Sequence, residues 1–170
     1  MRFLNLAVFI CALASLSAKE PAFSFDGQKY FLKYSPKDSE VALREFLPAG
    51  QTLDRWETLV SERMLFGFKD AKVYAQALVD GALESSPEAM GQIFRSDKDG
   101  SYVADFVLFA PEGTTDYLVE WNVMSVRKTA AGLSVTQYAR RYKEFDQSSV
   151  KKFNADKARI IPRLADLRIP

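Results

Sequence analysis

Four polar side chains in the second half of the chain could together form a binding site. If the turns between the predicted strands close symmetrically, Asp105, Glu120, Asn122 and Arg141 fall on one face of an antiparallel sheet. The acids and the amide can then accept or donate hydrogen bonds, and the guanidinium can offer a forked donor to a carboxylate or phosphate. The simpler interpretation is a solvent-facing sheet with an ordinary cross-strand ion pair between Glu120 and Arg141.

Carboxylate chemistry is the catalytic option that the composition leaves open. The chain has no histidine, and its only cysteine, Cys11, lies in the N-terminal apolar run. A Ser-His-Asp triad, a thiol nucleophile and a thiolate or imidazole metal site are therefore excluded from the rest of the chain. A glycosidase needs two carboxyl groups about 5–10 Å apart, which Asp105 and Glu120 could supply, but surface acids give such pairs by chance. We expect binding rather than catalysis, with no cofactor.

The sequence contains no complete metal-binding or nucleotide-binding motif. The run Asp97-Lys98-Asp99-Gly100 is similar to part of a calcium loop, but Arg95 stands where such a loop needs an acid, so a turn is the better interpretation. Neither Gly-x-Gly-x-x-Gly nor Gly-x-x-x-x-Gly-Lys occurs. We therefore expect no metal site and no phosphate loop.

The first 18 residues have the pattern of a signal peptide. Arg2 precedes an apolar run over residues 3–14, and small residues follow over 15–18. The run is shorter than the roughly 20 residues that a membrane-spanning helix needs, which counts against the alternative of an uncleaved anchor. We expect cleavage after Ser17 or Ala18 and a periplasmic or secreted mature protein.

The remainder has the composition of one folded domain with a basic tail. Hydrophobic residues make up 48% of the chain and aromatic residues 13%, which argues against disorder. We expect an α+β domain over 19–145 and a helical tail over 146–170. Nine basic and four acidic residues lie between 138 and 170, against thirteen and eighteen over 19–137. Because acids interrupt the basic residues, we expect the tail to fold back or to be solvated, and we expect no nucleic acid partner.

The first half of the mature chain predicts three strands and two helices. Strands over 22–25 and 28–34 flank Asp26-Gly27, a preferred two-residue hairpin turn, and a third strand covers 40–47. Thr52 looks like the N-cap of an amphipathic helix whose apolar stripe is Leu53, Trp56, Leu59, Val60 and Met64. A second helix over 70–84 is expected to face inward with Val73, Tyr74, Ala77 and Leu78.

The second half predicts a four-stranded meander followed by a helix. The strands cover 90–96, 101–110, 117–128 and 133–142, with turn residues between them. Symmetric turns pair Ala110 with Tyr117, and they place Gly91 opposite Phe106, Ala104 opposite Val123, and Val123 opposite Tyr138. The apolar face formed in this way also carries Trp121, for which we expect core packing rather than sugar stacking. Ser148 or Ser149 is expected to cap the last helix, and Pro162 to end or kink it. Its apolar positions are Val150, Phe153, Ile160, Ile161 and Leu164.

These elements predict an α+β fold: an antiparallel sheet of about six to seven strands with two helices packed on one face and a C-terminal helix. The stretch over 47–60 resembles a segment of small exported bacterial proteins of unassigned function. The order of elements, strands then helices then a meander, is similar to PsbP/Mog1-like domains. Neither resemblance supplies functional residues that can be carried over.

The expected function is that of an exported, non-catalytic binding or accessory protein of the cell envelope. Its partner is expected to be a protein of the envelope or outside the cell. One alternative is a small-ligand carrier with a pocket between sheet and helices, and another is a carboxylate-based hydrolase. The C-terminal helix could also contact a membrane, but docking on its own sheet is the simpler arrangement.

Overall fold

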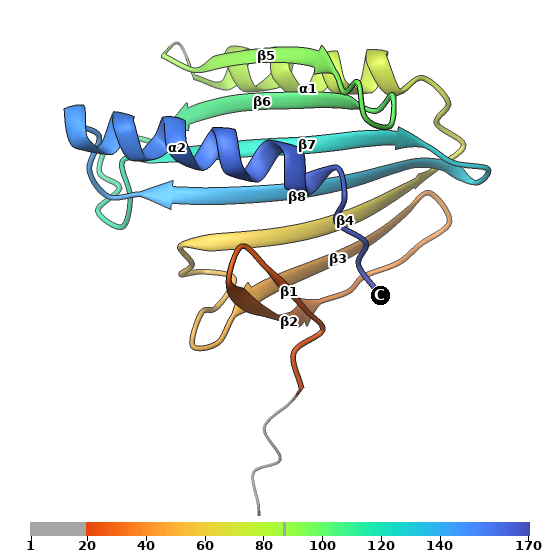
Figure 1. Cartoon of the computed structure of the whole chain (residues 1–170), viewed down its shortest axis with the longest axis horizontal. Helices are drawn as coiled ribbons and strands as arrows, with labels where there is room; N and C mark the ends of the chain where they lie inside the picture. The colour runs from red at the N-terminus through yellow and green to blue at the C-terminus, as the bar shows by residue number, and fades with distance from the viewer. Residues whose placement is uncertain (1–19, 87) are drawn as a thin grey trace, which may run out of the picture.

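One antiparallel sheet organises the chain (Figure 1), and the fold class is α+β as predicted. The computed structural model describes residues 20–86 and 88–170, so the predicted signal peptide lies outside the described residues. The sheet has eight strands rather than six to seven, in the order β1-β2-β3-β4-β8-β7-β6-β5. Their bounds are β1 Phe23–Phe25, β2 Gln28–Tyr34, β3 Val41–Pro48, β4 Thr58–Phe66, β5 Met90–Arg95, β6 Tyr102–Phe109, β7 Val119–Lys128 and β8 Gly132–Tyr142.

A single helical crossover explains this strand order. The helix α1 (Ala71–Ser85) carries the chain from β4 to the far edge of the sheet, where β5 begins. The predicted meander β5 to β8 then returns strand by strand until β8 pairs with β4. The strands β4 and β8 therefore join the two halves of the chain.

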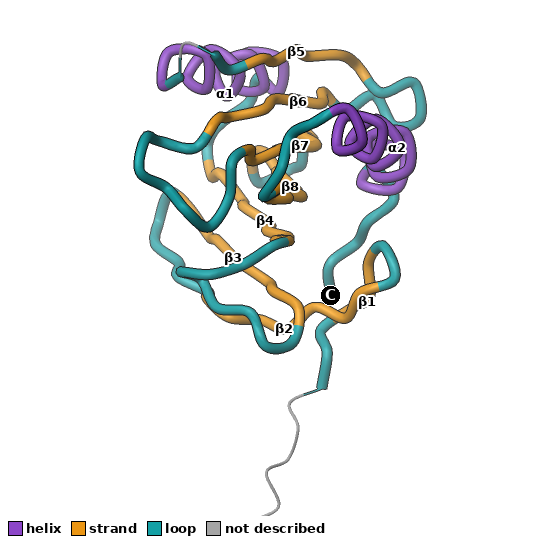
Figure 2. The backbone as a smooth tube through the Cα atoms, turned by 90° about the vertical axis from the view of Figure 1, so that its left-hand side faces the viewer, coloured by secondary structure: helices purple, strands orange, loops and turns teal. Residues whose placement is uncertain are grey.

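The two helices cover opposite faces of the sheet (Figure 2). Of the two helices predicted to pack together on one face, only the one over 70–84 is present, as α1, and the C-terminal helix is α2. The helix α1 packs on β5, β6 and β7 through Ala75, Val79 and Ala82. Two residues that we expected to face inward, Val73 and Ala77, are exposed. Glycine at position 91 leaves room for this packing, because a Cβ there would lie 2.7 Å from Val79 Cγ1.

The C-terminal helix α2 (Gln147–Leu164) packs on the other face, the docking onto its own sheet that we expected. Phe153, Ile160 and Leu164 enter the core as predicted, whereas Val150 is exposed. The side chain of Asp146, rather than Ser148 or Ser149, caps the helix. Pro162 lies inside the last turn and does not end the helix. Among the described residues, no helix is long and apolar enough to cross a membrane.

The segment predicted as the first amphipathic helix is instead the central strand β4. Thr58 and Val60 point to the α2 face, while Leu59 and Ser61 point to the α1 face, and all four are buried. Because side chains on both faces of this strand are buried, it does not need a clear alternation of polar and apolar residues. The three- and four-residue spacing of the apolar positions was therefore misleading, and Trp56 lies in the loop before the strand.

The predicted register of the meander is correct between β5 and β6 and between β7 and β8, and it is wrong between β6 and β7. Gly91 pairs with Phe106 and Val123 pairs with Tyr138, as predicted. Between β6 and β7, however, Ala104 pairs with Met124 instead of Val123. A one-residue slip exchanges the faces of a strand. Trp121 is therefore buried as expected, but it lies under α2 on the face opposite to Phe106.

Candidate functional site

The four predicted site residues lie on both faces of the sheet instead of one. Glu120, Asn122 and Arg141 share the face that α1 covers in part, because Asn122 lies opposite Phe106 and Arg141 opposite Glu120. Asp105 lies opposite Val123 and points to the α2 face. The structure therefore brings three of the four together and separates Asp105 from them.

Asp105 anchors helix α2 to the sheet. Its side chain is buried and accepts hydrogen bonds from Trp121 Nε1 at 2.8 Å and from Gln92 Nε2 at 3.0 Å. Lys157 of α2 forms an ion pair with the same carboxylate. With these partners the carboxylate is fully engaged, so its role is structural.

The other three residues belong to a row of hydrogen bonds across three strands. Ser61 Oγ donates to Gln137 Oε1 at 2.9 Å, and Gln137 Nε2 donates to Asn122 Oδ1 at 2.7 Å. Asn122 Nδ2 donates to Glu120 Oε1 at 3.1 Å. At the end of the row, Arg141 Nε donates to Glu120 Oε2 at 2.9 Å, which is the cross-strand pair that the sequence predicted. The members of the row satisfy one another.

Arg141 is held more rigidly than an ordinary surface arginine. Its guanidinium carbon lies 3.9 Å from the centre of the Trp56 ring and 4.2 Å from the centre of the Tyr117 ring. The two rings come from the loops before β4 and before β7, so the fold places them around the end of β8. Within the described part of the chain, the only hydrogen bond from this guanidinium is the one from Nε to Glu120. Its two terminal nitrogens remain available to a ligand.

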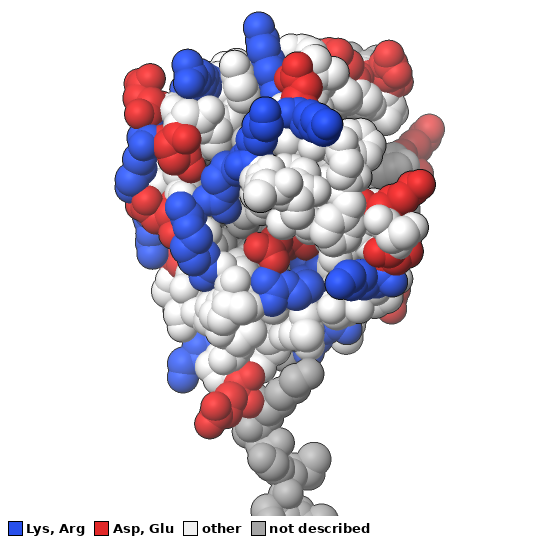
Figure 3. Space-filling model, turned by 90° about the vertical axis from the view of Figure 1, so that its right-hand side faces the viewer, with Lys and Arg blue, Asp and Glu red and all other residues white. Residues whose placement is uncertain are grey.

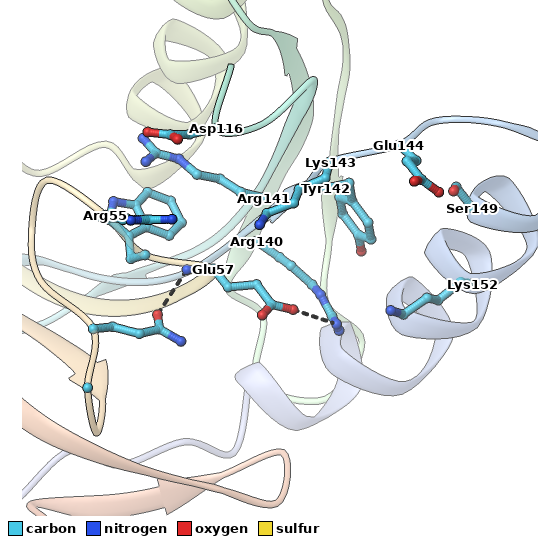
Figure 4. A pocket seen from close by; sticks show the side chains of 13 residues that line it. Arg55, Glu57, Asp116, Arg140, Arg141, Tyr142, Lys143, Glu144, Ser149 and Lys152 are labelled. Atoms are coloured by element: carbon cyan, nitrogen blue, oxygen red, sulfur yellow. Dashed lines mark hydrogen bonds and ion pairs between the residues drawn. The ribbon is translucent and has the colours of Figure 1, made fainter. Parts of the chain in front are cut away.

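The Arg141 side chain lines a hollow of about 670 Å³ at the end of β8, which we call the Arg141 hollow (Figure 4). The end of β8, the loop between β3 and β4, the loop between β6 and β7, and the start of α2 form its walls. In Figure 4 the end of the Arg141 side chain lies toward Asp116, and Lys152 approaches from α2. The charged lining residues are Arg55, Glu57, Asp116, Arg140, Arg141, Lys143, Glu144 and Lys152.

Arg140 has a different role from its neighbour Arg141. It donates to Asp156 Oδ2 of α2 at 2.9 Å and forms a longer ion pair with Glu57 at 3.5 Å. Burial opposes the charge on Arg140, but Tyr138, Asp156 and other neighbours more than offset this, so the Arg140 pKa is raised. Burial also raises the pKa of Tyr142, whose hydroxyl donates to Asp156 at 3.0 Å. The hydrogen bonds from Arg140 and Tyr142 to Asp156 join β8 to α2, and these two β8 side chains line one wall of the hollow.

The structure separates the two carboxylates that were considered for catalysis. Asp105 and Glu120, the pair considered for glycoside hydrolysis, point to opposite faces of the sheet and cannot act on one bond. Across residues 20–86 and 88–170, no three acidic, histidine or cysteine side chains gather where they could hold a metal ion. What the hollow offers is a preorganised forked donor beside aromatic rings and further cations.

Sequence reasoning missed the residues that make Arg141 distinctive. Trp56 was assigned to a helix and Tyr117 to a strand, although both lie in loops. The adjacent pair Arg140 and Arg141 at the end of a predicted strand could have indicated two separate roles, since neighbouring residues of a strand point to opposite faces. That alternation is what sends one arginine to α2 and the other to the hydrogen-bonded row.

A protein-family model matches residues 16–169, and the family is an uncharacterised one. No curated protein matches the chain significantly, and no solved structure does. The residues of the site are therefore the basis for a functional conclusion.

Proposed function

Because this chain belongs to that uncharacterised family, we infer its function from its own site. We propose that it is an exported, non-catalytic binding protein of the cell envelope and that the Arg141 hollow binds a carboxylate of a partner protein. The observation that carries this proposal is the arginine with a fixed plane and unbonded terminal nitrogens.

The geometry around Arg141 selects for a planar anion. The rings of Trp56 and Tyr117 lie 3.9 and 4.2 Å from the guanidinium carbon and restrict how a ligand can approach. The terminal nitrogens are the donors left for a ligand, and their two parallel N–H groups match a carboxylate. Three acids, Glu57, Asp116 and Glu144, also line the hollow and oppose a more highly charged group such as phosphate. A single carboxylate fits this balance better than a dianion.

The one acid of the row, Glu120, supports a binding role in another way. Glu120 already accepts hydrogen bonds from Asn122 and Arg141, so both of its carboxylate oxygens are engaged. Its contribution is to fix the plane of the arginine, as a positioning residue fixes a ligand-binding group. Glu120 thus orients Arg141 for the carboxylate that we propose as its ligand.

Site-specific photo-crosslinking tests the proposal in cells that produce the full chain. A photoreactive phenylalanine derivative replaces Glu144 at the rim of the hollow, or Asp80 on the outer side of α1; both positions are exposed. We expect a protein adduct from position 144 that position 80 does not give. The change Arg141→Gln should remove the adduct, and Arg141→Lys should remove most of it because lysine has no fork.

The matched control is Arg55→Gln, which removes one positive charge from an exposed position of the same hollow. This variant should keep most of the adduct. If Arg55→Gln and Arg141→Gln lose it equally, general charge attraction rather than the stacked arginine drives binding. An adduct that persists unchanged in Arg141→Gln contradicts the site.

Export is part of the proposal and has its own test. The predicted signal peptide lies outside the described residues, so localisation rests on the pattern of residues 1–18. N-terminal sequencing of material purified from the periplasm or medium should begin at Ala18 or Lys19. A chain that begins at Met1 contradicts export by this route.

A small-molecule carboxylate is a second candidate ligand, because the volume of the hollow falls in the range of about 300–1,000 Å³ found for small-ligand sites. Such a site would lie at the end of the sheet rather than between sheet and helices, where apolar side chains fill both interfaces. Titrating the purified protein with acetate and succinate, while following the Arg141 Nε–H signal by NMR, distinguishes this carrier function from protein binding.

A further inference from the structure

A second hollow lies at the opposite end of the sheet. Its volume is about 550 Å³, and it is formed by the start of α1, the turn between β5 and β6, the end of β7 and the C-terminal segment. Figure 3 faces this end of the molecule and shows a run of Lys and Arg side chains across it. We call it the Arg127 hollow, after its least exposed arginine.

Positive charge dominates the Arg127 hollow. Its cationic lining residues are Lys69, Lys72, Arg127, Lys128 and Arg168, against the acids Asp70 and Asp99. Both acids have other roles. Asp70 Oδ1 accepts from Val73 N at 3.0 Å and caps α1. Asp99 Oδ1 accepts from the backbone N–H and the hydroxyl of Ser101, at 3.1 and 2.7 Å.

The two arginines are incompletely neutralised. Arg127 donates to the Ala165 carbonyl at 3.2 Å and to Thr136 Oγ1 at 3.1 Å, both uncharged acceptors, and its ion pair with Asp99 spans 4.0 Å. Burial and the charge of Arg168 lower the pKa of Arg127. Arg168 itself donates to backbone carbonyls near its own position. An anion placed between these two arginines would relieve their repulsion.

The three lysines of this hollow form no ion pair with any residue in the described part of the chain. Lys69 and Lys72 flank the N-terminus of α1, where the first backbone N–H groups and the helix dipole also favour negative charge. Lysine ammonium groups are compact charges that adapt to a tetrahedral anion. This composition differs from the Arg141 hollow, where a planar stacked donor and three acids are present.

We propose that the Arg127 hollow binds a phosphate group, carried either by a small soluble molecule or by an anionic phospholipid. The proposal is independent of the carboxylate site, because the two hollows share no lining residue. The exposed ring of Phe68 next to Lys69 gives the lipid source a specific contact.

The test uses pyrophosphate, inorganic phosphate and vesicles with the purified mature protein. Isothermal titration with each anion measures soluble binding, and co-sedimentation compares phosphatidylcholine vesicles with and without phosphatidylglycerol. The double variant Lys72→Gln, Lys128→Gln removes two exposed charges of the hollow. Losing even one charge-assisted hydrogen bond to an anion weakens binding about tenfold, so we expect at least that loss from this variant.

A matched control removes the same charge elsewhere. The double variant Lys29→Gln, Lys33→Gln changes two exposed lysines of β2 and should alter binding less than about twofold at moderate salt. Binding of pyrophosphate or phosphate assigns the ligand to the soluble class, and binding only to phosphatidylglycerol vesicles assigns it to lipid. No binding to any probe, or equal losses in the two double variants, overturns the proposal. Arg141→Gln should leave this binding unchanged, so the two proposals can fail separately.

Discussion

Replacing Asp105 by alanine should destabilise the protein substantially, because this carboxylate holds both the core indole and helix α2. The substitution leaves the Trp121 N–H, in a fully buried ring, without its acceptor at 2.8 Å. An unsatisfied buried donor costs about 1–3 kcal/mol. Lys157 loses its ion pair, but it is partly exposed and can be rehydrated, so we add only about 1 kcal/mol for it.

The expected loss of unfolding free energy is therefore about 2–4 kcal/mol. For a domain of this size each kcal/mol lowers Tm by roughly 2–4 °C, so Asp105→Ala should lower Tm by roughly 10 °C. Urea unfolding followed by tryptophan fluorescence measures the free energy. Hydrogen exchange of the Trp121 indole N–H, followed by NMR, reports on the specific bond and should accelerate in the variant.

Asp105→Asn is the matched variant, since its side-chain oxygen can still accept from Trp121 while the charge is lost. It should cost roughly half as much as Asp105→Ala, and Asp54→Ala, at an exposed loop position, should cost less than about 0.5 kcal/mol. If Asp105→Ala costs less than about 1 kcal/mol, or if both Asp105 variants cost the same, the assignment of Asp105 as an anchor is wrong.

Two further predictions concern backbone space and acid stability. Gly91→Ala should destabilise by about 1–3 kcal/mol, because the new Cβ would lie 2.7 Å from Val79 Cγ1; Gly81→Ala, with nothing within 4 Å in the middle of α1, should stabilise by up to about 1 kcal/mol. Hydrogen bonds from Ser149 and Ser148 lower the pKa of the cap Asp146 to about 2, so its stabilising effect is present above pH 4 and is lost as the pH falls toward 2. The urea midpoint of Asp146→Asn should consequently fall less than that of the wild type between pH 4 and pH 2.

The sequence was sufficient where a local turn determines the structure. Asp26-Gly27 adopts the positive φ values, 51° and 77°, that its hairpin requires, and β1 pairs with β2 as expected. The turn at 97–100 likewise set the register of β5 against β6. In each case a short connection with a defined backbone conformation leaves one way to pair the strands.

The sequence was insufficient where tertiary pairing overrides a local pattern. The apolar residues over 53–64 recur at three- and four-residue steps, but β3 and β8 both pair with residues 58–66, which are a strand. The loop between β6 and β7 is longer and does not close symmetrically: Ala110 N donates to the carbonyl of Leu118 rather than pairing with Tyr117. That difference of one residue moved Asp105 to the α2 face and freed Tyr117 to contact Arg141.

The position of Arg141 at the end of its hydrogen-bonded row explains why binding should occur there and not along the sheet. Asn122 and Gln137 each use both ends of their amides on neighbours, so a ligand that contacted them would have to break existing bonds. Exchanging such a bond for one to the ligand gains only the difference in free energy between the two hydrogen bonds, which leaves little net affinity. Arg141 uses only its Nε donor on Glu120, and its terminal nitrogens are left for a new acceptor. A ligand can therefore bind there without breaking an existing hydrogen bond, at a side chain that is already ordered. A row of mutually satisfied side chains therefore stabilises the sheet, and only its terminal member keeps donors for the ligand that we propose.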